Sequence, residues 1–372
     1  VLAVIIILLI LLVVGVVVGV VVSKNKSQNS ATLSSSTSSS GGKSTTGQTT
    51  GITNGSNDPS VFEKDPNLHK SFYGMAYTPE GSMMPNCSNS LENVIKDIQA
   101  TPLSTDHSGS FLEAIKQTKV EMEVFVGIYV LPNNNESYIR QRDIVKDAIQ
   151  TYGVDHIAGV TVGNEFMLNY ISEKQESDPN SAIGNEGAAM LIAYIEDTRN
   201  MLAGLSLPKT MPVGNSDAGS YFNTKVLSSV DYGAISIFPQ LSNVHAWFAQ
   251  VTAGEAAAWV ASFFEDTNVK PASQLPNQPK MYIAETGWPT KSSDAAHESN
   301  GAGIASVTGL QTFLDTFVCQ ANNNNIPYFF FELFDEKWKD IQYGGVEGWW
   351  GLFNADRSLK DVKIPECPSL DP

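Results

Sequence analysis

Basic residues are scarce in this chain, which holds 23 Lys and Arg against 39 Asp and Glu among its 372 residues. The formal net charge is therefore −16. A protein this acidic repels the phosphates of nucleic acids, so we expect no nucleic-acid partner. A neutral substrate fits this charge better, although acidity by itself is weak evidence because many secreted proteins are acidic.

Cysteine is also rare, with only Cys87, Cys319 and Cys367 in the whole sequence. No two of them form a CxxC pair and no His-rich cluster accompanies them, so a zinc site is not expected. One disulfide and one odd thiol is the simplest arrangement, and we pair Cys319 with Cys367. Three free, buried thiols are the alternative.

The signatures of several enzyme classes are missing. The sequence has no G-x-S-x-G elbow of a serine hydrolase and no H-E-x-x-H motif of a zinc protease. Its nearest match to a dinucleotide-binding loop, GAGIAS at 301–306, follows a polar loop rather than a strand. We therefore expect neither a metal nor another cofactor.

The first 60 residues do not have the composition of a folded domain. Residues 1–22 are uninterruptedly apolar and uncharged, and a helix of this length spans a bilayer core of about 30 Å. No small-residue cleavage site follows, so we predict a transmembrane signal anchor rather than a removed signal peptide. Residues 23–60 are rich in Ser, Thr and Gly and are predicted to form a disordered stalk. Residues 61–372 are predicted to form the catalytic domain.

Short apolar runs alternate with amphipathic helical stretches through this last region. Such alternation predicts a parallel sheet with crossover helices, and the number of units favours a (β/α)8 TIM barrel over an open doubly wound sheet. The predicted strands are 71–77, 123–130, 156–165, 211–219, 242–249, 280–290 and 326–334. The predicted helices lie within 91–99, 110–118, 137–152, 187–205, 253–265 and 303–321.

The second strand of such a barrel has no counterpart in the sequence. The segment 100–110, ATPLSTDHSGS, is short, polar and turn-like, with no apolar run that could cross a barrel wall. We therefore predict that the second strand is missing or degenerate, which would leave its neighbours unpaired. Conversely, the segment AISIFPQL at 234–241 looks like an insertion ahead of the strand predicted at 242–249.

Two predicted strands each end in a glutamate. The run GVTV leads into Gly163-Asn164-Glu165, and the run MYIA leads into Glu285. Catalytic groups of barrel enzymes lie at the carboxyl ends of the strands, and two carboxyl groups flanking a glycosidic bond are what its hydrolysis needs. For either glutamate alone, a solvated loop position or a structural ion pair would be an adequate explanation.

Several motifs resemble those of glycoside hydrolase family 17, in particular its fungal, membrane-anchored glucan endo-1,3-β-glucosidase branch. The matching stretches include VGNE, PVGNSDAGSYFN, NVHAWFA, ETGWPT, FFELFDEKWK and WWGLFNADRSLK. The resemblance implies a (β/α)8 barrel that cleaves or rearranges β-1,3-glucan. It implies Glu165 as the general acid and then base, and Glu285 as the nucleophile of a retaining mechanism, with the two carboxyl groups about 5–5.5 Å apart.

Other residues are candidates for holding the sugar. Asn164 is expected to hydrogen-bond the sugar 2-hydroxyl, with a turn role as the alternative. Seven residues at or just past strand ends are predicted to contact sugar or support the residues that do, although core or rim packing is an equal alternative: Tyr77, Tyr129, Asp217, His245, Trp247, Trp288 and Glu332. The motif Glu336, Trp338 and Lys339 is compatible with a structural salt bridge, and Trp349 and Trp350 with a sugar platform or with packing.

The sequence thus predicts a retaining endo-β-1,3-glucan hydrolase acting on cell-wall glucan. A β-1,3-glucanosyltransferase would use the same residues, and the missing strand leaves open a catalytically impaired, glucan-binding wall protein. The anchor at 1–22 predicts a single-pass type II protein of the plasma membrane, with its catalytic domain outside and facing the wall.

Overall fold

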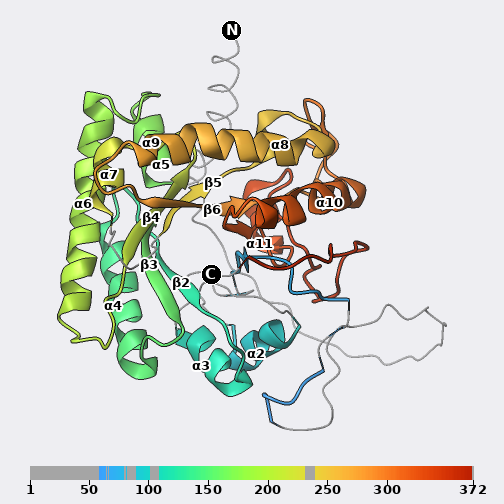
Figure 1. Cartoon of the computed structure of the whole chain (residues 1–372), viewed down its shortest axis with the longest axis horizontal. Helices are drawn as coiled ribbons and strands as arrows, with labels where there is room; N and C mark the ends of the chain where they lie inside the picture. Colours follow the sequence, from blue (N-terminus) through green and yellow to red (C-terminus); the bar gives the residue numbers. More distant parts are fainter. Residues whose placement is uncertain are drawn as a thin grey trace, which may run out of the picture. The chain divides into compact units, whose positions relative to one another are not determined.

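The computed structural model describes residues 58–63, 65, 67–78, 81, 89–100, 109–230 and 239–370 (Figure 1). The predicted membrane span at 1–22 and almost all of the predicted stalk lie outside this range, as does Cys87. Among the residues described, no helix is both long enough and apolar enough to cross a membrane.

The described residues from 58 onward alternate strands with helices. The strands are β1 (Gly74–Met75), β2 (Val124–Ile128), β3 (Ile157–Asn164), β4 (Val213–Ala218), β5 (Pro239–Asn243), β6 (Lys280–Thr286), β7 (Ser299–Asn300), β8 (Gly303–Ile304) and β9 (Tyr328–Phe330). The helices are α2 (Leu91–Gln99), α3 (Gly109–Thr118), α4 (Asn135–Tyr152), α5 (Phe166–Glu173), α6 (Ala182–Ala203), α7 (Thr224–Ser229), α8 (Ala253–Phe264), α9 (Lys270–Ser273), α10 (Val307–Asn323) and α11 (Lys337–Tyr343).

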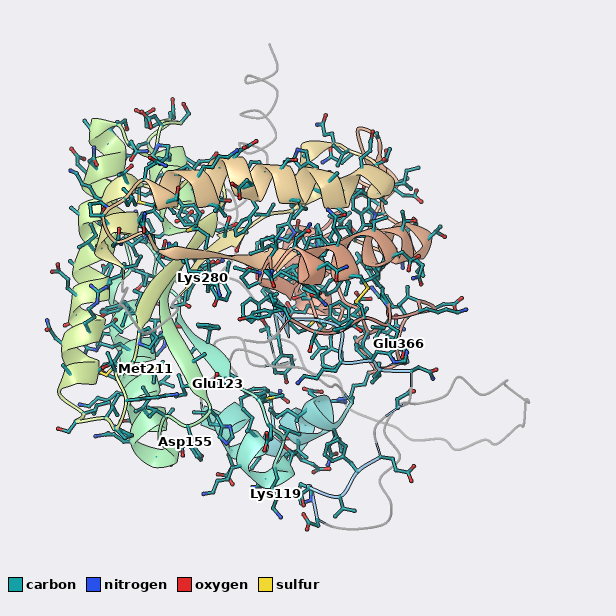
Figure 2. The ribbon with its side chains drawn as sticks, viewed as in Figure 1. Lys119, Glu123, Asp155, Met211, Lys280 and Glu366 are labelled. Carbon is teal, nitrogen blue, oxygen red and sulfur yellow. A yellow bond between two sulfur atoms is a disulfide. The ribbon has the colours of Figure 1, made fainter. Side chains whose placement is uncertain are left out.

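Seven strands form one sheet in the order β1-β9-β6-β5-β4-β3-β2, and every neighbouring pair is parallel. The strand β3 is buried along almost its whole length, as expected of a sheet covered on both faces. All carboxyl ends of parallel strands lie at one edge. The amino ends of β2, β3, β4 and β6 are marked in Figure 2 by Glu123, Asp155, Met211 and Lys280.

The sheet is strongly curled. The ring of Phe125 on β2 lies 5.7 Å from that of Phe329 on β9 and 6.4 Å from that of Tyr282 on β6, measured between centroids. In the sheet order β2 and β9 are separated by four strands. Contact between their side chains therefore requires the sheet to roll up, with aromatic rings filling its concave side.

The rolled sheet ends at the two strands between which a second barrel strand would lie. In the described part of the chain, β1 pairs only with β9 and β2 pairs only with β3. The segment predicted to lack the second strand falls mostly at 101–108, outside the described residues. The described residues therefore form seven of the eight strands of the predicted barrel, in its order.

One strand was predicted in the wrong place. The strand expected at 242–249 is β5 at Pro239–Asn243, and Ala246–Ala249 form a 3-10 turn instead. The predicted insertion at 234–241 is accordingly wrong for its last residues, because they belong to β5. The remainder, 234–238, lies outside the described residues.

Local signals begin and end the helices. Ser181 and Ser306 cap α6 and α10 by accepting the amides of Gly184 and Gly309, and Thr252 with Glu255 forms a capping box on α8.

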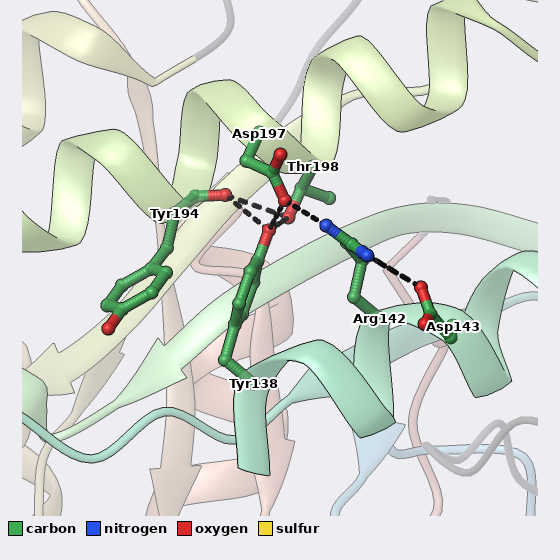
Figure 3. Close-up of polar contacts among 6 residues, drawn as sticks. All are labelled: Tyr138, Arg142, Asp143, Tyr194, Asp197 and Thr198. Atoms are coloured by element: carbon green, nitrogen blue, oxygen red, sulfur yellow. Dashed lines mark hydrogen bonds and ion pairs between the residues drawn. The ribbon is translucent and has the colours of Figure 1, made fainter. Parts of the chain in front are cut away.

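Helices α4 and α6 are joined by a polar cluster (Figure 3). The Tyr138 hydroxyl lies 2.7 Å from an Asp197 carboxylate oxygen, and the same oxygen pairs with Arg142. The hydroxyl also contacts Tyr194 and Thr198.

The predicted disulfide is confirmed, because Cys319 of α10 is bonded to Cys367. The side-chain amide of Asn322, also on α10, donates to the carbonyl of Ser71, and the Ser71 hydroxyl donates to the carbonyl of Pro365. The segment near residue 367 is thereby fastened both to α10 and to the residues that lead into β1.

The packing of β1 on β9 gives a testable prediction. A Cβ atom added at Gly74 would lie 2.4 Å from the ring of Phe329, so Gly74→Ala should lower the free energy of unfolding by about 1–3 kcal/mol. The matched control is Gly254→Ala on α8, where the nearest atom would be 4.0 Å away. That variant should be neutral or stabilising by up to about 1 kcal/mol. Denaturant unfolding of both variants checks the difference, and equal stabilities would contradict this packing.

Candidate active site

The two predicted catalytic glutamates lie at the carboxyl edge of the sheet. Glu165 directly follows β3, and Glu285 is the penultimate residue of β6. Strands β4 and β5 separate them in the sheet. Both side chains are partly exposed, so they are accessible from the solvent at the edge where barrel enzymes hold their catalytic groups.

The backbone turns sharply at Glu165. Its φ is 53°, a left-handed conformation that non-glycine residues rarely adopt, and it begins α5 without capping that helix with its own side chain. The buried carboxylate of Asp217, on β4, accepts the amides of Met167 and Leu168 in its place. Asp217 therefore caps α5 and leaves the carboxyl group of Glu165 free to face the site.

A pair of buried side-chain amides supports the strands next to the same turn. The side chains of Asn215 and Gln240 are almost fully buried and bond to each other, with Nε2 of Gln240 2.9 Å from Oδ1 of Asn215. Asn215 also donates to the carbonyl of Val162 on β3. Gln240 belongs to β5, Asn215 to β4 and Val162 to β3. The pair therefore fixes the register of these three strands near Glu165.

Asn243, the last residue of β5, stands between the two glutamates. Its Nδ2 lies 3.2 Å from Oε1 of Glu165 and 3.2 Å from Oδ1 of Asn164. On its other side Asn243 is the register partner of Glu285, and the next amide, that of Val244, donates to the Glu285 carbonyl at 2.8 Å. Asn243 is not among the predicted site residues, because it stood near the start of the strand predicted at 242–249 and not at the end of a strand.

The environment of Glu165 favours its protonated form. Burial raises the pKa of its carboxyl group to about 7, and the negative charge of Glu285 adds to this effect. The hydrogen bond from Asn243 and the proximity of His245 oppose the rise in pKa without cancelling it. A carboxyl group that holds its proton near neutral pH is suited to act as a general acid.

Glu285 has a different set of neighbours. Nε2 of His245 lies 3.4 Å from its Oε2. The imidazole is held edge-on against three aromatic rings, those of Trp350, Phe331 and Phe248, at centroid distances of 4.9, 5.3 and 6.0 Å. Of the predicted residues, His245 therefore lies beside the candidate nucleophile, in a fixed orientation.

The predicted salt bridge after the last strand is present. The ammonium group of Lys339 lies 2.7 Å from Glu332 and 2.8 Å from Glu336. Burial raises the pKa of Glu332 well above its ordinary value, and the charge of Lys339 counteracts this rise. Glu285 also raises the pKa of Glu332, so this buried cluster adjoins the catalytic edge.

Glu347 is a further carboxyl group of the site that the sequence analysis did not single out. Burial raises the pKa of Glu347, the charges of His245 and Lys339 lower it, and Glu285 raises it. Its only signal in the sequence is its place two residues before the tryptophan pair at 349–350. The site therefore gathers more acidic than basic groups.

Three predicted sugar-contacting residues lie in the core instead. Tyr77 is buried and donates to Asp97 at 2.6 Å. Trp247 and Trp288 are buried against each other at a centroid distance of 5.4 Å, and the Trp288 indole donates to the carbonyl of Ile304. The prediction of direct sugar contact is corrected for these residues, because no ring face is open to a ligand.

The remaining aromatic candidates differ in exposure. Tyr129, just past β2, is 43 % exposed. Burial of its hydroxyl raises its pKa, and the charges of Tyr343 and Glu165 add to the rise, which puts Tyr129 near the catalytic edge. Trp350 is buried, whereas Trp349 is partly exposed with Lys291 4.2 Å above its ring.

The described residues contain no group of three or more His, Cys, Asp or Glu side chains arranged to hold a metal. The expectation of a site without metal or cofactor stays a prediction.

A parallel α/β sheet that carries a glutamate at the carboxyl end of each of two strands defines the class of barrel-type glycoside hydrolases. The BtgE/BtgC glycoside hydrolase domain matches residues 74–351 of the chain. The chain belongs to this family of glycoside hydrolases, which confirms the resemblance recognised in its motifs.

Related proteins agree with this assignment. The chain is 30% identical over 331 residues to a probable glucan endo-1,3-beta-glucosidase btgC of Aspergillus flavus, covering 82% of this chain and 45% of the relative. It is 29% identical over 338 residues to a putative protein of the same name from Aspergillus niger, covering 84% of this chain and 46% of the relative. The chain thus spans less than half the length of these relatives.

Solved structures share the fold. The family 17 beta-1,3-glucanosyltransferase of Rhizomucor miehei superposes with a TM-score of 0.60 at 20% identity, covering 79% of this chain and 98% of that one. An endo-laminarinase of Formosa Hel1_33_131 superposes with a TM-score of 0.58 at 18% identity, covering 78% and 86%. At these identities the comparison establishes the parallel α/β fold.

The raised pKa of Glu165 predicts a pH-dependent stability. A carboxyl group whose pKa rises from 4.5 to about 7 on folding destabilises the fold above pH 4.5, and the whole penalty is present above about pH 7. Glu165→Gln should therefore raise the melting temperature at pH 8 and have little effect at pH 4. The control Glu123→Gln makes the same change at the amino end of β2, away from the site. Calorimetric melting of both variants between these pH values checks this, and a constant difference for Glu165→Gln would contradict it.

Proposed function

We propose that this protein is a retaining endo-β-1,3-glucan hydrolase that acts on cell-wall glucan. The observation that carries the proposal is the unlike environment of two glutamates at one edge of the sheet. Glu165 is held in surroundings that retain a proton, whereas Glu285 lies beside His245. Family membership and the names of the relatives supply the reaction class and the glucan substrate.

In the first half of the reaction, the Glu285 carboxylate attacks the anomeric carbon while Glu165 gives its proton to the departing sugar oxygen. The bond between the anomeric carbon and that oxygen breaks, and a covalent glycosyl–Glu285 ester forms. In the second half, Glu165 accepts a proton from water, whose oxygen displaces Glu285 and restores both groups. This sequence retains the anomeric configuration and requires the two carboxyl groups to lie about 5–5.5 Å apart.

The contacts of Asn164 suit the role predicted for it. Its Oδ1 accepts a hydrogen bond from Asn243, so its amide nitrogen is the end available to donate to a sugar 2-hydroxyl. Tyr129, exposed at the end of β2, is the aromatic candidate for contact with a sugar ring. Asp217 and Glu332 support the site through the helix cap and the Lys339 salt bridge.

Two alternatives share this site. A β-1,3-glucanosyltransferase would pass the same intermediate to a sugar hydroxyl instead of water. A catalytically impaired glucan-binding protein is favoured by one observation in the sequence, the polar, turn-like segment 100–110 where the second strand of a barrel is expected. For the chain as a whole the closed (β/α)8 barrel remains a proposal.

The test of activity uses the full chain and β-1,3-gluco-oligosaccharides, with products sized by mass spectrometry. The wild-type protein should give shorter products from mid-chain cleavage, and Glu285→Gln should lower the rate by about 10⁴-fold or more. Glu123→Gln, far from the site at the amino end of the sheet, should retain the wild-type rate. Longer products would identify the transferase, and binding by a folded but inactive wild type would support the glucan-binding alternative.

We propose further that residues 1–22 anchor the protein in the plasma membrane and that residues 23–60 hold the catalytic domain outside, towards the wall. The support is the uninterrupted apolar run followed by a Ser/Thr/Gly-rich stretch. Protease treatment of intact cells should release the catalytic domain while a cytosolic marker stays whole. Protection of the domain until the cells are lysed would exclude this topology.

A further inference from the structure

Both polar atoms of the Asn243 side-chain amide have hydrogen-bonding partners. Its two N–H groups face two acceptors, Oε1 of Glu165 and Oδ1 of Asn164, each at 3.2 Å. Its own oxygen accepts the hydroxyl of Ser216 at 3.3 Å. In this orientation every polar atom of the amide has a partner, whereas a flipped amide would set its oxygen against Oδ1 of Asn164.

The strand that carries Asn243 is fixed on both sides. The side chain is 6 % exposed, and the preceding residue, Ser242, is bonded through its hydroxyl to Asn268 at 3.1 Å. The following amide, of Val244, is bonded to the carbonyl of Glu285. These contacts on both sides hold the backbone of Asn243 in place beside Glu165.

This geometry distinguishes the two oxygens of Glu165. The oxygen that accepts an N–H bond is the less favourable of the two for the proton, because a carbonyl oxygen accepts such a bond better than a protonated carboxyl oxygen does. The other oxygen, Oε2, has no such donor from Asn243. The other titratable groups that interact with this carboxyl group act on it as a whole and do not replace this directional contact: Glu285, Glu347, His245, Asp217, Tyr129 and Tyr221.

We infer that Asn243 is a positioning residue of the acid–base step, which holds Oε1 of Glu165 as an acceptor so that the catalytic proton resides on Oε2. The same amide ties Glu165 to Asn164, so that the group donating to the leaving oxygen and the group binding the 2-hydroxyl move together. The inference rests on the proposed function and deepens it. In the first half-reaction the proton leaves Oε2 for the glycosidic oxygen as its bond to the anomeric carbon breaks, and Glu285 forms the new bond.

The leaving group of the substrate gives a specific test. In the nitrophenyl β-glycoside of laminaribiose, the nitrophenolate group leaves with little help from an acid. The leaving sugar of an oligosaccharide needs the proton. In the full chain, Asn243→Ala, which removes the donor, and Asn243→Asp, which puts a carboxylate in its place, should each lower kcat/KM for the oligosaccharide about 10- to 100-fold. The same variants should lower it less than about 3-fold for the aryl substrate.

The matched control is Ser242→Ala, which removes one buried hydrogen bond from the same strand next to Asn243. It should lower the melting temperature without changing the ratio of the two activities. Equal losses on both substrates in Asn243→Asp and Asn243→Ala would overturn the inference, because a general disturbance of the site would not depend on the leaving group.

A second measurement keeps the inference separate from the proposed function. The carboxyl group of Glu165 is titrated by ¹³C NMR in the full chain, with Glu165→Gln to identify its signal. Loss of the donor in Asn243→Ala should raise its titration midpoint by about one pH unit. If the wild type cleaves neither substrate, the proposed function fails, and the midpoint alone decides whether Asn243 controls the proton of Glu165. An unchanged midpoint overturns the inference in either case.

Discussion

A carboxyl group keeps its proton near neutral pH only where water is largely excluded from it, and this constraint governs the carboxyl edge of the sheet. Glu165 meets it in the turn after β3, where its side chain is only partly exposed and the negative charge of Glu285 adds to the effect of burial. Burying acidic groups is costly, so the surrounding elements must supply compensating contacts. Asp217 receives two amides of α5, and Glu332 and Glu336 share the ammonium group of Lys339.

The positions of the catalytic pair could be predicted from sequence because their signal is local. A run of apolar residues that stops at a glutamate identifies a strand end, and parallel strands bring all such ends to one edge. The runs before Glu165 and Glu285 are of this kind. The disulfide between Cys319 and Cys367 was predicted as well, although three cysteines allow three pairings. Family resemblance added the roles of the two glutamates, which their positions alone could not distinguish.

What the sequence did not predict depends on contacts between distant segments. The strand β5 reads PQLSN, without the apolar alternation of a strand, because its inner side chains bond to amides and hydroxyls of neighbouring strands. This is why the strand was placed too late and Asn243 was overlooked. Likewise the burial of Trp288 depends on the absence of a side chain at Gly309, where a Cβ would lie 2.5 Å from the indole nitrogen.

The fastening of Ser71 to Asn322 and Pro365, together with the Cys319–Cys367 bond, has a mechanical consequence. The segment that enters the catalytic unit before β1 and the segment near residue 367 meet at one end of α10. Detaching the entering segment from α10 therefore requires the loss of the hydrogen bonds of Ser71, whose partners Asn322 and Pro365 belong to two segments that are joined covalently.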